Sequence, residues 1–215
     1  YVPLATAPLL TRRLYQPTAT TALYDAVAGG LTNMVLYAQQ LRASGVMVRC
    51  IVIVYSDGAD NASRQRAADV RRAAEERGLF LEYNFSLDAS EYDDRLTHTM
   101  EEGIAIAESI GSDIGKISMD IHRPHPVCGS TFHPEVIPQL EDIARKAEAA
   151  APVAQSAGVR LCLENHTEAF SDEVLWIINR VNHPYVGVCV DTNNSLIVGE
   201  DPLTAIRTLA PLSRP

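Results

Sequence analysis

Short apolar runs alternate with longer stretches of helical spacing from residue 49 to the end of the chain. The runs are rich in β-branched residues and almost continuously hydrophobic, which is typical of strands covered on both faces of a parallel sheet. They occupy residues 49–56, 79–84, 116–122, 160–166 and 186–191. Because a helical stretch separates each run from the next, the pattern predicts an α/β fold of about five parallel strands with right-handed crossovers.

The segments between these strands, and one segment ahead of them, space their apolar residues as helices do. The predicted helices span residues 21–45, 61–78, 90–111, 134–158, 171–181 and 201–210. Ser90 and Asp201 stand at N-cap positions, and Gly111 and Gly158 stand at helix ends. Pro152 lies inside the fourth of these helices and is a candidate for a kink.

Two consecutive predicted strands end on an acidic residue. Glu164 closes the run LCLE, and Asp191 closes the run VCVD. His122 ends the strand before them, and Asn84 ends an earlier one. Parallel α/β folds place their chemistry at the carboxyl ends of the strands, so these side chains are predicted to share one edge of the sheet. The pattern favours a metal-binding edge, while solvated strand ends or helix N-caps remain the alternative explanation for both acids.

The composition argues against several classes of protein. The formal net charge is −9, and no Lys/Arg cluster is dense enough to follow a phosphate backbone, so nucleic-acid binding is not expected. No apolar run reaches the ~18–20 residues that a membrane span needs, and the first residues do not have the pattern of a signal peptide. The four cysteines form no CxxC pair and are predicted to be reduced thiols of a cytoplasmic protein.

Three motifs carry a resemblance to a known family: AAEERGLFLEYN, GVRLCLENH and VGVCVDTNNSLIVGEDPLTAI. Through them, residues 66–215 resemble the sugar phosphate isomerase/epimerase family of xylose-isomerase-like TIM barrels. The resemblance implies that Glu164 and Asp191, ending the fifth and sixth barrel strands, bind a divalent metal such as Mn²⁺, Mg²⁺ or Co²⁺. It also implies that Glu164 is catalytic, moving a proton beside the carbonyl of an open-chain sugar or sugar phosphate.

The family completes its metal site with a histidine after the seventh strand and a glutamate after the eighth, and neither falls within these 215 residues. The active site is therefore predicted to be incomplete. His122 and His166 are candidates for substrate binding on the same edge, although each could be a loop residue without a role, and His166 could instead support a metal ligand. Asn194 matches a position where the family often keeps a polar contact to substrate.

The first part of the chain resembles a different family. YQPTATTALYDAV followed by IVIVYSDGADNAS is similar to the von Willebrand factor A-type domain. That resemblance implies an adhesion-type metal site containing Thr21 and Asp57, without the family's Asp-x-Ser-x-Ser loop. Residues 1–70 would then be a von Willebrand A-like, Rossmann-like segment and residues 71–215 a partial (βα)8 barrel, joined in one sheet. An engineered chimera is the favoured origin, and a natural fusion and a prediction artefact stay open.

Three functional hypotheses follow. The first is a metal-dependent sugar isomerase or epimerase with an incomplete active site, the second a non-catalytic scaffold with vestigial sites, and the third a metal-dependent adhesion module. A closed barrel of this type needs eight strands and about five are predicted. The sheet is therefore expected either to stay open in a flavodoxin-like layout or to be completed in a homodimer.

Overall fold

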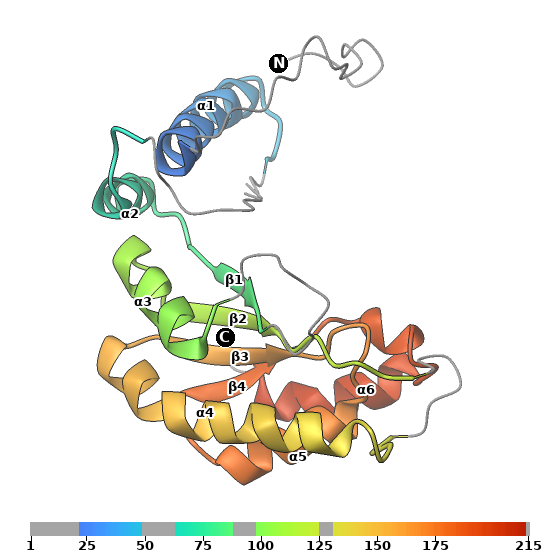
Figure 1. Cartoon of the computed structure of the whole chain (residues 1–215). Helices are drawn as coiled ribbons and strands as arrows, with labels where there is room; N and C mark the ends of the chain where they lie inside the picture. The colour runs from blue at the N-terminus through green and yellow to red at the C-terminus, as the bar shows by residue number, and fades with distance from the viewer. Residues whose placement is uncertain (1–21, 49–62, 88–97, 125–130, 214–215) are drawn as a thin grey trace, which may run out of the picture. The chain divides into compact units, whose positions relative to one another are not determined.

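The computed structural model of the chain describes residues 22–48, 63–87, 98–124 and 131–213 (Figure 1). The chain divides into two compact units, Tyr1–Arg66 and Ala67–Pro215. All strands in the described ranges belong to the second unit. The strand predicted at residues 49–56 lies outside the described residues, so a sheet that continues across both parts of the chain stays a prediction.

Helix α1 (Leu23–Ala43) forms most of the described part of the first unit, where apolar spacing predicts a helix. Gly45 follows its end with a φ of 82°, a left-handed conformation that favours glycine. The carboxylate of Asp25, in the first turn, accepts hydrogen bonds from the backbone N–H groups of Arg64 (3.0 Å) and Gln65 (2.9 Å). A segment distant in sequence is thereby held against the start of the helix.

The second unit alternates parallel strands with helices. In chain order the elements are α2 (Ala67–Glu75), β1 (Tyr83–Ser86), α3 (Met100–Ile110), β2 (Ile114–Ser118), α4 (Ile137–Ala157), β3 (Arg160–Glu164), α5 (Ser171–Val181), β4 (Val186–Cys189) and α6 (Pro202–Leu209). Every described strand is parallel to its neighbour, and the order across the sheet is β1-β2-β3-β4. The predicted α/β fold with parallel strands is therefore confirmed.

The strand order is that of an arc of a (βα)8 barrel. In a flavodoxin-like sheet the order reverses direction, whereas each described strand here lies beside its neighbours in sequence. Helices α3, α4 and α5 form one layer over the sheet, and each packs against the helix that follows it (Figure 1). The flavodoxin-like layout considered from the sequence is thus wrong for the described strands.

Small residues on α4 and branched residues on the strands form the core between helices and sheet. The small side chains allow α4 to approach the sheet closely. Buried members of this core include Ala144, Ala147, Ala154, Ile117, Leu161 and Leu163. Helix α4 continues through Pro152, which is exposed, to Ala157.

Strand β1 extends further than its predicted end at Asn84. That prediction is wrong, because the strand continues to Ser86. The ring of Phe85 lies under α3, with atoms 2.3–2.6 Å from the position that a Cβ at Gly103 would take. Because Gly103 has no side chain, the ring of Phe85 can pack against α3. This packing favours an extended backbone beyond Asn84.

Strand β2 ends earlier than predicted. It stops at Ser118, and Asp120 then adopts a φ of 53°, in the left-handed region that extended strands do not use. His122 therefore lies in the segment beyond the strand, and the prediction that it ends the strand is wrong. The loop that follows β2, which contains Asp120 and His122, begins at the carboxyl edge of the sheet.

Side-chain caps set the start of two helices. Thr99 and Glu102 form a capping box at the start of α3. The prediction that Ser90 caps this helix is wrong, because α3 begins only at Met100 and residues 98 and 99 are not helical. Asp201 caps α6 as predicted, accepting a hydrogen bond from the N–H of Thr204 (3.0 Å).

After α6, the short helix η3 (Ala210–Leu212) leads to Ser213, which forms an isolated parallel bridge with Val188 of β4. None of the helices in the described ranges combines the length and the apolar character needed to cross a membrane.

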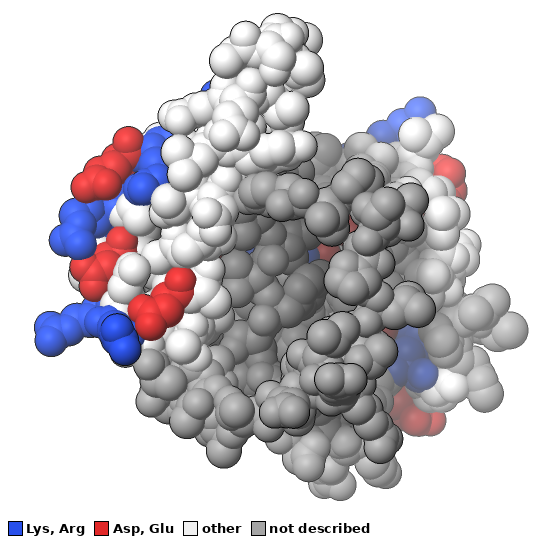
Figure 2. All heavy atoms as spheres, turned by 90° about the horizontal axis from the view of Figure 1, so that it is seen from above, with Lys and Arg blue, Asp and Glu red and all other residues white. Residues whose placement is uncertain are grey.

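Charged side chains of both signs are interspersed among the described residues on the face in Figure 2. Helix α2 has this pattern, with exposed pairs between Arg71 and Glu75 (2.8 Å) and between Arg72 and Asp69 (2.6 Å). Exposed pairs of this kind contribute little stability, and mixed signs create no extended field for a polyanion.

Candidate metal and substrate site

The carboxyl ends of β2, β3 and β4 lie side by side at one edge of the sheet, because the strands are parallel and in register. Glu164 closes β3 and is the register partner of Cys189, the last residue of β4. Asp191 follows Cys189 by two residues. Both predicted metal ligands therefore stand at the ends of neighbouring strands.

Glu164 is buried, and its two carboxylate oxygens have different partners. The ammonium nitrogen of Lys116 lies 2.9 Å from Oε1, and the hydroxyl of Ser118 donates a hydrogen bond of 3.2 Å to Oε2. Both partners belong to β2, the neighbouring strand. The side chain of Glu164 is 5% exposed and that of Lys116 is 17% exposed, so this ion pair is largely shielded from water.

Lys116 supplies the positive charge beside Glu164. Burial by itself would lower the pKa of Lys116, but the hydrogen bond and the negative charge of Glu164 together outweigh burial and raise the pKa. The lysine is thus a cation at neutral pH. A metal ion that binds Glu164 would have to share the carboxylate with it.

Asn165 fixes the backbone of Asp191. Its side chain accepts a hydrogen bond from the Asp191 N–H (2.7 Å) and donates one to the Asp191 carbonyl oxygen (2.8 Å). The amide thereby continues the ladder between β3 and β4 past the end of the strands. Sequence reasoning missed this residue, which is 1% exposed. The signal that could have identified Asn165 is its position directly after Glu164.

The carboxylate of Asp191 turns back on its own chain. Its Oδ1 accepts hydrogen bonds from the backbone N–H groups of Asn193 (2.8 Å) and Asn194 (3.1 Å) at the start of the short helix η2 (Asn194–Leu196). This is an Asx turn ahead of η2, whose N-cap residue is Asn193, so Asp191 is not the helix N-cap that the sequence left open as an alternative to metal ligation. Asn194, the predicted substrate contact, is half-buried in the same turn.

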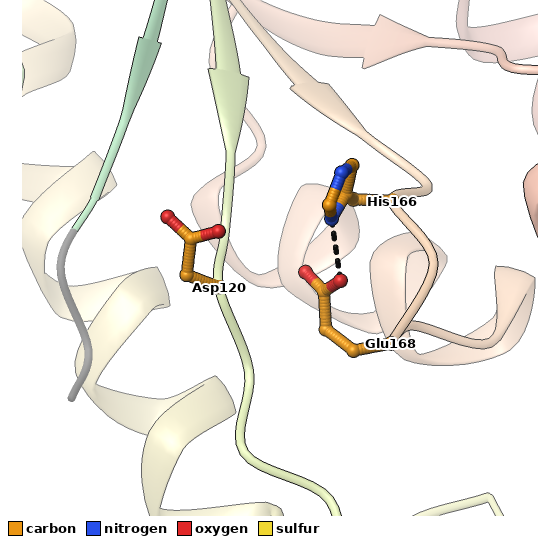
Figure 3. Close-up of side chains that lie close together, drawn as sticks. All are labelled: Asp120, His166 and Glu168. Carbon is orange, nitrogen blue, oxygen red and sulfur yellow. Dashed lines mark hydrogen bonds and ion pairs between the residues drawn. The ribbon is translucent and has the colours of Figure 1, made fainter. Parts of the chain in front are cut away.

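His166 pairs with Glu168 in the loop after β3, with Nδ1 2.5 Å from Oε2 (Figure 3). This hydrogen bond raises the pKa of His166; burial opposes the rise, and the negative charges of Glu168, Glu164 and Asp120 add to it. His166 therefore lies close enough to Glu164 to be influenced by its negative charge.

His122, the other predicted histidine, is exposed. Gln139 of α4 holds its backbone with two hydrogen bonds of 2.8 Å, one from the His122 N–H to Oε1 and one from Nε2 to the His122 carbonyl oxygen. The segment after β2 is thereby tied to α4. Thr21 and Asp57, predicted for the adhesion-type metal site, lie outside the described residues.

A buried ion pair that sequence reasoning missed holds the strand-end loops. The guanidinium of Arg123, after β2, pairs with Glu173 of α5, and the two side chains are 1% and 0% exposed. Arg123 Nε donates a hydrogen bond to the carbonyl oxygen of Glu168 (3.0 Å). Glu173 accepts hydrogen bonds from the N–H groups of Phe132 (2.7 Å) and Phe170 (3.0 Å). Both charges are therefore hydrogen-bonded, as burial requires.

Cys162 on β3 and Cys189 on β4 are free thiols. Burial raises the pKa of Cys162 to about 11, and burial is also the main cause that raises the pKa of Cys189. Both side chains are therefore neutral near pH 7. Neutral thiols are poor nucleophiles.

A family model described as "Xylose isomerase-like TIM barrel" matches residues 38–213. The chain belongs to this family. The match begins inside the segment for which the sequence predicts a von Willebrand A-like structure, and it includes every strand-end residue described above. The comparisons offer no support for the von Willebrand A resemblance or for a chimera, and both stay predictions.

Three solved structures with this fold are each 20% identical to the chain or less. A xylose isomerase-like TIM barrel protein from Mycobacterium smegmatis in complex with magnesium is 20% identical, with 89% of this chain and 67% of that chain covered and a TM-score of 0.54. L-ribulose 3-epimerase is 18% identical, with 72% and 55% covered and a TM-score of 0.54. A xylose isomerase domain protein from Planctomyces limnophilus is 20% identical, with 69% and 56% covered and a TM-score of 0.51.

The chain thus spans little more than half the length of the last two proteins. No curated protein matches the sequence.

Proposed function

We propose that this chain is a metal-dependent sugar isomerase/epimerase-like protein in which Glu164 and Asp191 bind the metal and Glu164 is also catalytic. The observation that carries the proposal is a pair of acidic residues after adjacent strand ends: the Glu164 carboxylate is buried on β3, and the backbone of Asp191, after β4, is held by the side chain of Asn165. Membership of the xylose isomerase-like family supports it. So does the likeness to L-ribulose 3-epimerase and to D-psicose 3-epimerase with D-tagatose from Clostridium cellulolyticum.

The two carboxylates fit a cation of the Mg²⁺, Mn²⁺ or Co²⁺ class. Such cations accept carboxylate oxygens, and Mg²⁺ commonly takes one or two from a protein and keeps water at its other positions. Each oxygen of Glu164 has one partner above and retains another lone pair, and the backbone bonds to Asp191 use Oδ1. When bound, the cation would polarise the carbonyl and adjacent hydroxyl of an open-chain sugar.

The proton is moved by the chain's own groups in this proposal. Glu164 takes a proton from the carbon beside the sugar carbonyl and returns it, as a general base and then a general acid. Lys116 and Ser118 each hold one of its oxygens, which fixes the orientation of the carboxylate. His122, His166 and Asn194 are the proposed substrate contacts around it.

Glu164 and Asp191 are two of the four metal ligands that the family resemblance implies. The resemblance adds a histidine after the seventh barrel strand and a second glutamate after the eighth. Two protein ligands hold a divalent cation more weakly than four do, and inversion at carbon requires an acid/base group on the other face of the sugar. We therefore expect slow proton exchange from this chain, with little net epimerisation.

Proton exchange tests the proposal directly. The full chain is incubated in D₂O with a ketohexose and Mn²⁺, and deuterium at the carbon beside the carbonyl is followed by NMR. We expect incorporation that is lost in Glu164→Gln and on chelation, and that is retained in the exposed control Glu141→Gln. Absence of incorporation with Mn²⁺, Mg²⁺ and Co²⁺ alike would reject catalysis by this chain.

One observation favours a second candidate, a non-catalytic scaffold with vestigial sites. Glu164 already pairs with Lys116, and the Asp191 carboxylate holds the turn that leads into η2, so both acids have structural roles without a metal. The scaffold predicts that Lys116→Met and Glu164→Gln each lower the stability of the chain, and that added Mn²⁺ changes the stability of neither variant nor of the wild type. A Mn²⁺-dependent gain confined to chains that retain Glu164 favours the enzyme.

A further inference from the structure

The strand-end loops carry a second group of potential metal ligands that shares no side chain with the Glu164–Asp191 pair. Ligand atoms of Asp120, His166 and Glu168 all lie within 4.8 Å of one another, and within the described residues no other group of three His, Cys, Asp or Glu does so. Asp120 follows β2, whereas His166 and Glu168 follow β3 (Figure 3). We propose that Asp120, His166 and Glu168, the 120/166/168 triad, bind a divalent transition-metal cation.

The spacing of the three ligand atoms suits such an ion. In a tetrahedral site with ligands about 2.1 Å from the metal, neighbouring ligand atoms stand about 3.4 Å apart. His166 Nδ1 and Glu168 Oε2 lie 2.5 Å apart, and all three ligand atoms lie within 4.8 Å. Side-chain movements of about 1 Å therefore open the histidine–glutamate contact and place a cation between the three groups.

The charge of the triad favours a cation. Asp120 and Glu168 place two carboxylates beside the imidazole of His166 in a half-buried position. Within the described residues, Lys116 pairs with Glu164 and Arg123 pairs with Glu173. A divalent cation would offset both carboxylates and use the imidazole nitrogen as a third ligand.

The loop that carries Glu168 is held before any ion binds. Arg123 Nε donates a hydrogen bond to the Glu168 carbonyl oxygen (3.0 Å), and the Ile121 N–H donates one to Glu168 Oε1 (3.4 Å). The hydroxyl of Thr167 donates a further bond to Glu168 Oε2 (3.2 Å). Contacts of this kind orient a ligand and reduce the entropy that ion binding must overcome.

The ligand set also separates this site from the Glu164–Asp191 pair. An imidazole nitrogen with two carboxylates suits Zn²⁺, Co²⁺ or Ni²⁺, whereas two carboxylates alone suit Mg²⁺ or Mn²⁺. Co²⁺ bound at the triad should therefore resist competition by excess Mg²⁺. The site does not depend on the proposed isomerase function.

Co²⁺ titration of the full chain, followed by its visible absorption, tests the triad. We expect bands that saturate in the presence of excess Mg²⁺, and an affinity that falls at least about tenfold in His166→Gln, Glu168→Gln and Asp120→Asn. His183→Gln is the matched control, because His183 is a half-buried histidine that precedes β4 at the opposite end of the strand. Far-UV circular dichroism confirms that each variant is folded.

Three results would overturn the proposal. Equal Co²⁺ affinities and spectra in the wild type and all three triad variants, or no Co²⁺ bands at all, would leave the His166–Glu168 contact as an ion pair only. Loss of the bands in Glu164→Gln, with the triad variants unaffected, would assign the Co²⁺ to the Glu164–Asp191 pair. Deuterium exchange depends on Glu164, so the failure of one proposal is distinguishable from the failure of the other.

Discussion

Two groups of acidic side chains share the carboxyl edge of the sheet, and different parts of the fold hold them. Glu164 and Asp191 belong to strand ends, where the register of β2, β3 and β4 and the side chain of Asn165 position them. The 120/166/168 triad belongs to loops, which are tied together through Arg123. The first group also has a lysine beside it, whereas in the triad His166 is the basic group.

This difference predicts how metal binding at each group responds to substitutions elsewhere in the chain. Strand-borne ligands should tolerate changes in the loops, and loop-borne ligands should depend on the ion pair that holds the loops. The four variants below separate the two groups, and they run from the largest expected loss of stability to the smallest.

Glu173→Gln should have the largest effect and should weaken the triad. It leaves the buried guanidinium of Arg123 without its counter-charge, so we expect the free energy of unfolding in urea to fall by about 3–5 kcal/mol. Co²⁺ affinity at the triad should fall, and Mn²⁺ affinity at the Glu164–Asp191 pair should not. The control is Glu148→Gln, which removes an exposed partner of Arg180. Equal losses in the two variants would contradict the loop-anchoring role.

Lys116→Met should destabilise the chain by about 2–3 kcal/mol, less than Glu173→Gln, because the Lys116–Glu164 pair retains some contact with water. The same change frees Glu164 for a metal. We therefore expect Mn²⁺ to bind about tenfold more tightly and to restore part of the lost stability in a thermal unfolding assay. Weaker Mn²⁺ binding than in the wild type would show that Lys116 supports the metal and does not compete with it.

Asn165→Ala should cost about 2 kcal/mol, because the N–H and the carbonyl oxygen of Asp191 both lose their partner. The substitution should also weaken metal binding at Glu164 and Asp191. Calorimetric titration should show weaker Mn²⁺ binding, with unchanged Co²⁺ binding at the triad. If Asn165→Ala binds Mn²⁺ and Co²⁺ with the affinities of the wild type, Asn165 does not position the metal ligands.

Glu168→Gln should have the smallest effect on stability, below about 1 kcal/mol, because His166 is partly exposed. The pKa of His166, raised by Glu168 in the wild type, should fall in this variant when its imidazole is titrated by NMR. The stability from the charged pair is present below the unfolded pKa of about 6.5 and is lost as pH rises through the folded pKa. The wild type and Glu168→Gln should therefore converge in stability as pH rises, and divergence would contradict the assignment.

The alternation of strands and helices was predictable from the sequence because each element carries its own apolar pattern. Helix α5 has the predicted bounds, and the strands β3 and β4 lie within their predicted runs. The end of β1 was not predictable, because it depends on how the ring of Phe85 packs against Gly103 of α3. The end of β2 depends in the same way on the left-handed backbone of Asp120.

The candidate site divides along similar lines. Glu164 and Asp191 could be found from sequence, since each closes an apolar run. The partnership of Lys116 with Glu164 could not, because it requires the register between β2 and β3. The triad combines a residue after β2 with two after β3, and the helix α4 separates these segments in the chain. Contacts between distant segments are the part of a site that a single sequence does not encode visibly.

Mn²⁺ binding by the full chain, measured from the free Mn²⁺ signal in electron paramagnetic resonance, tests the central claim most directly. We predict weak binding by the wild type that is reduced in both Glu164→Gln and Asp191→Asn and is unchanged in His166→Gln. Glu141→Gln, an exposed change on α4, should behave as the wild type. The same Mn²⁺ binding in the wild type, Glu164→Gln and Asp191→Asn would contradict the account, because the two acids would then not hold the metal.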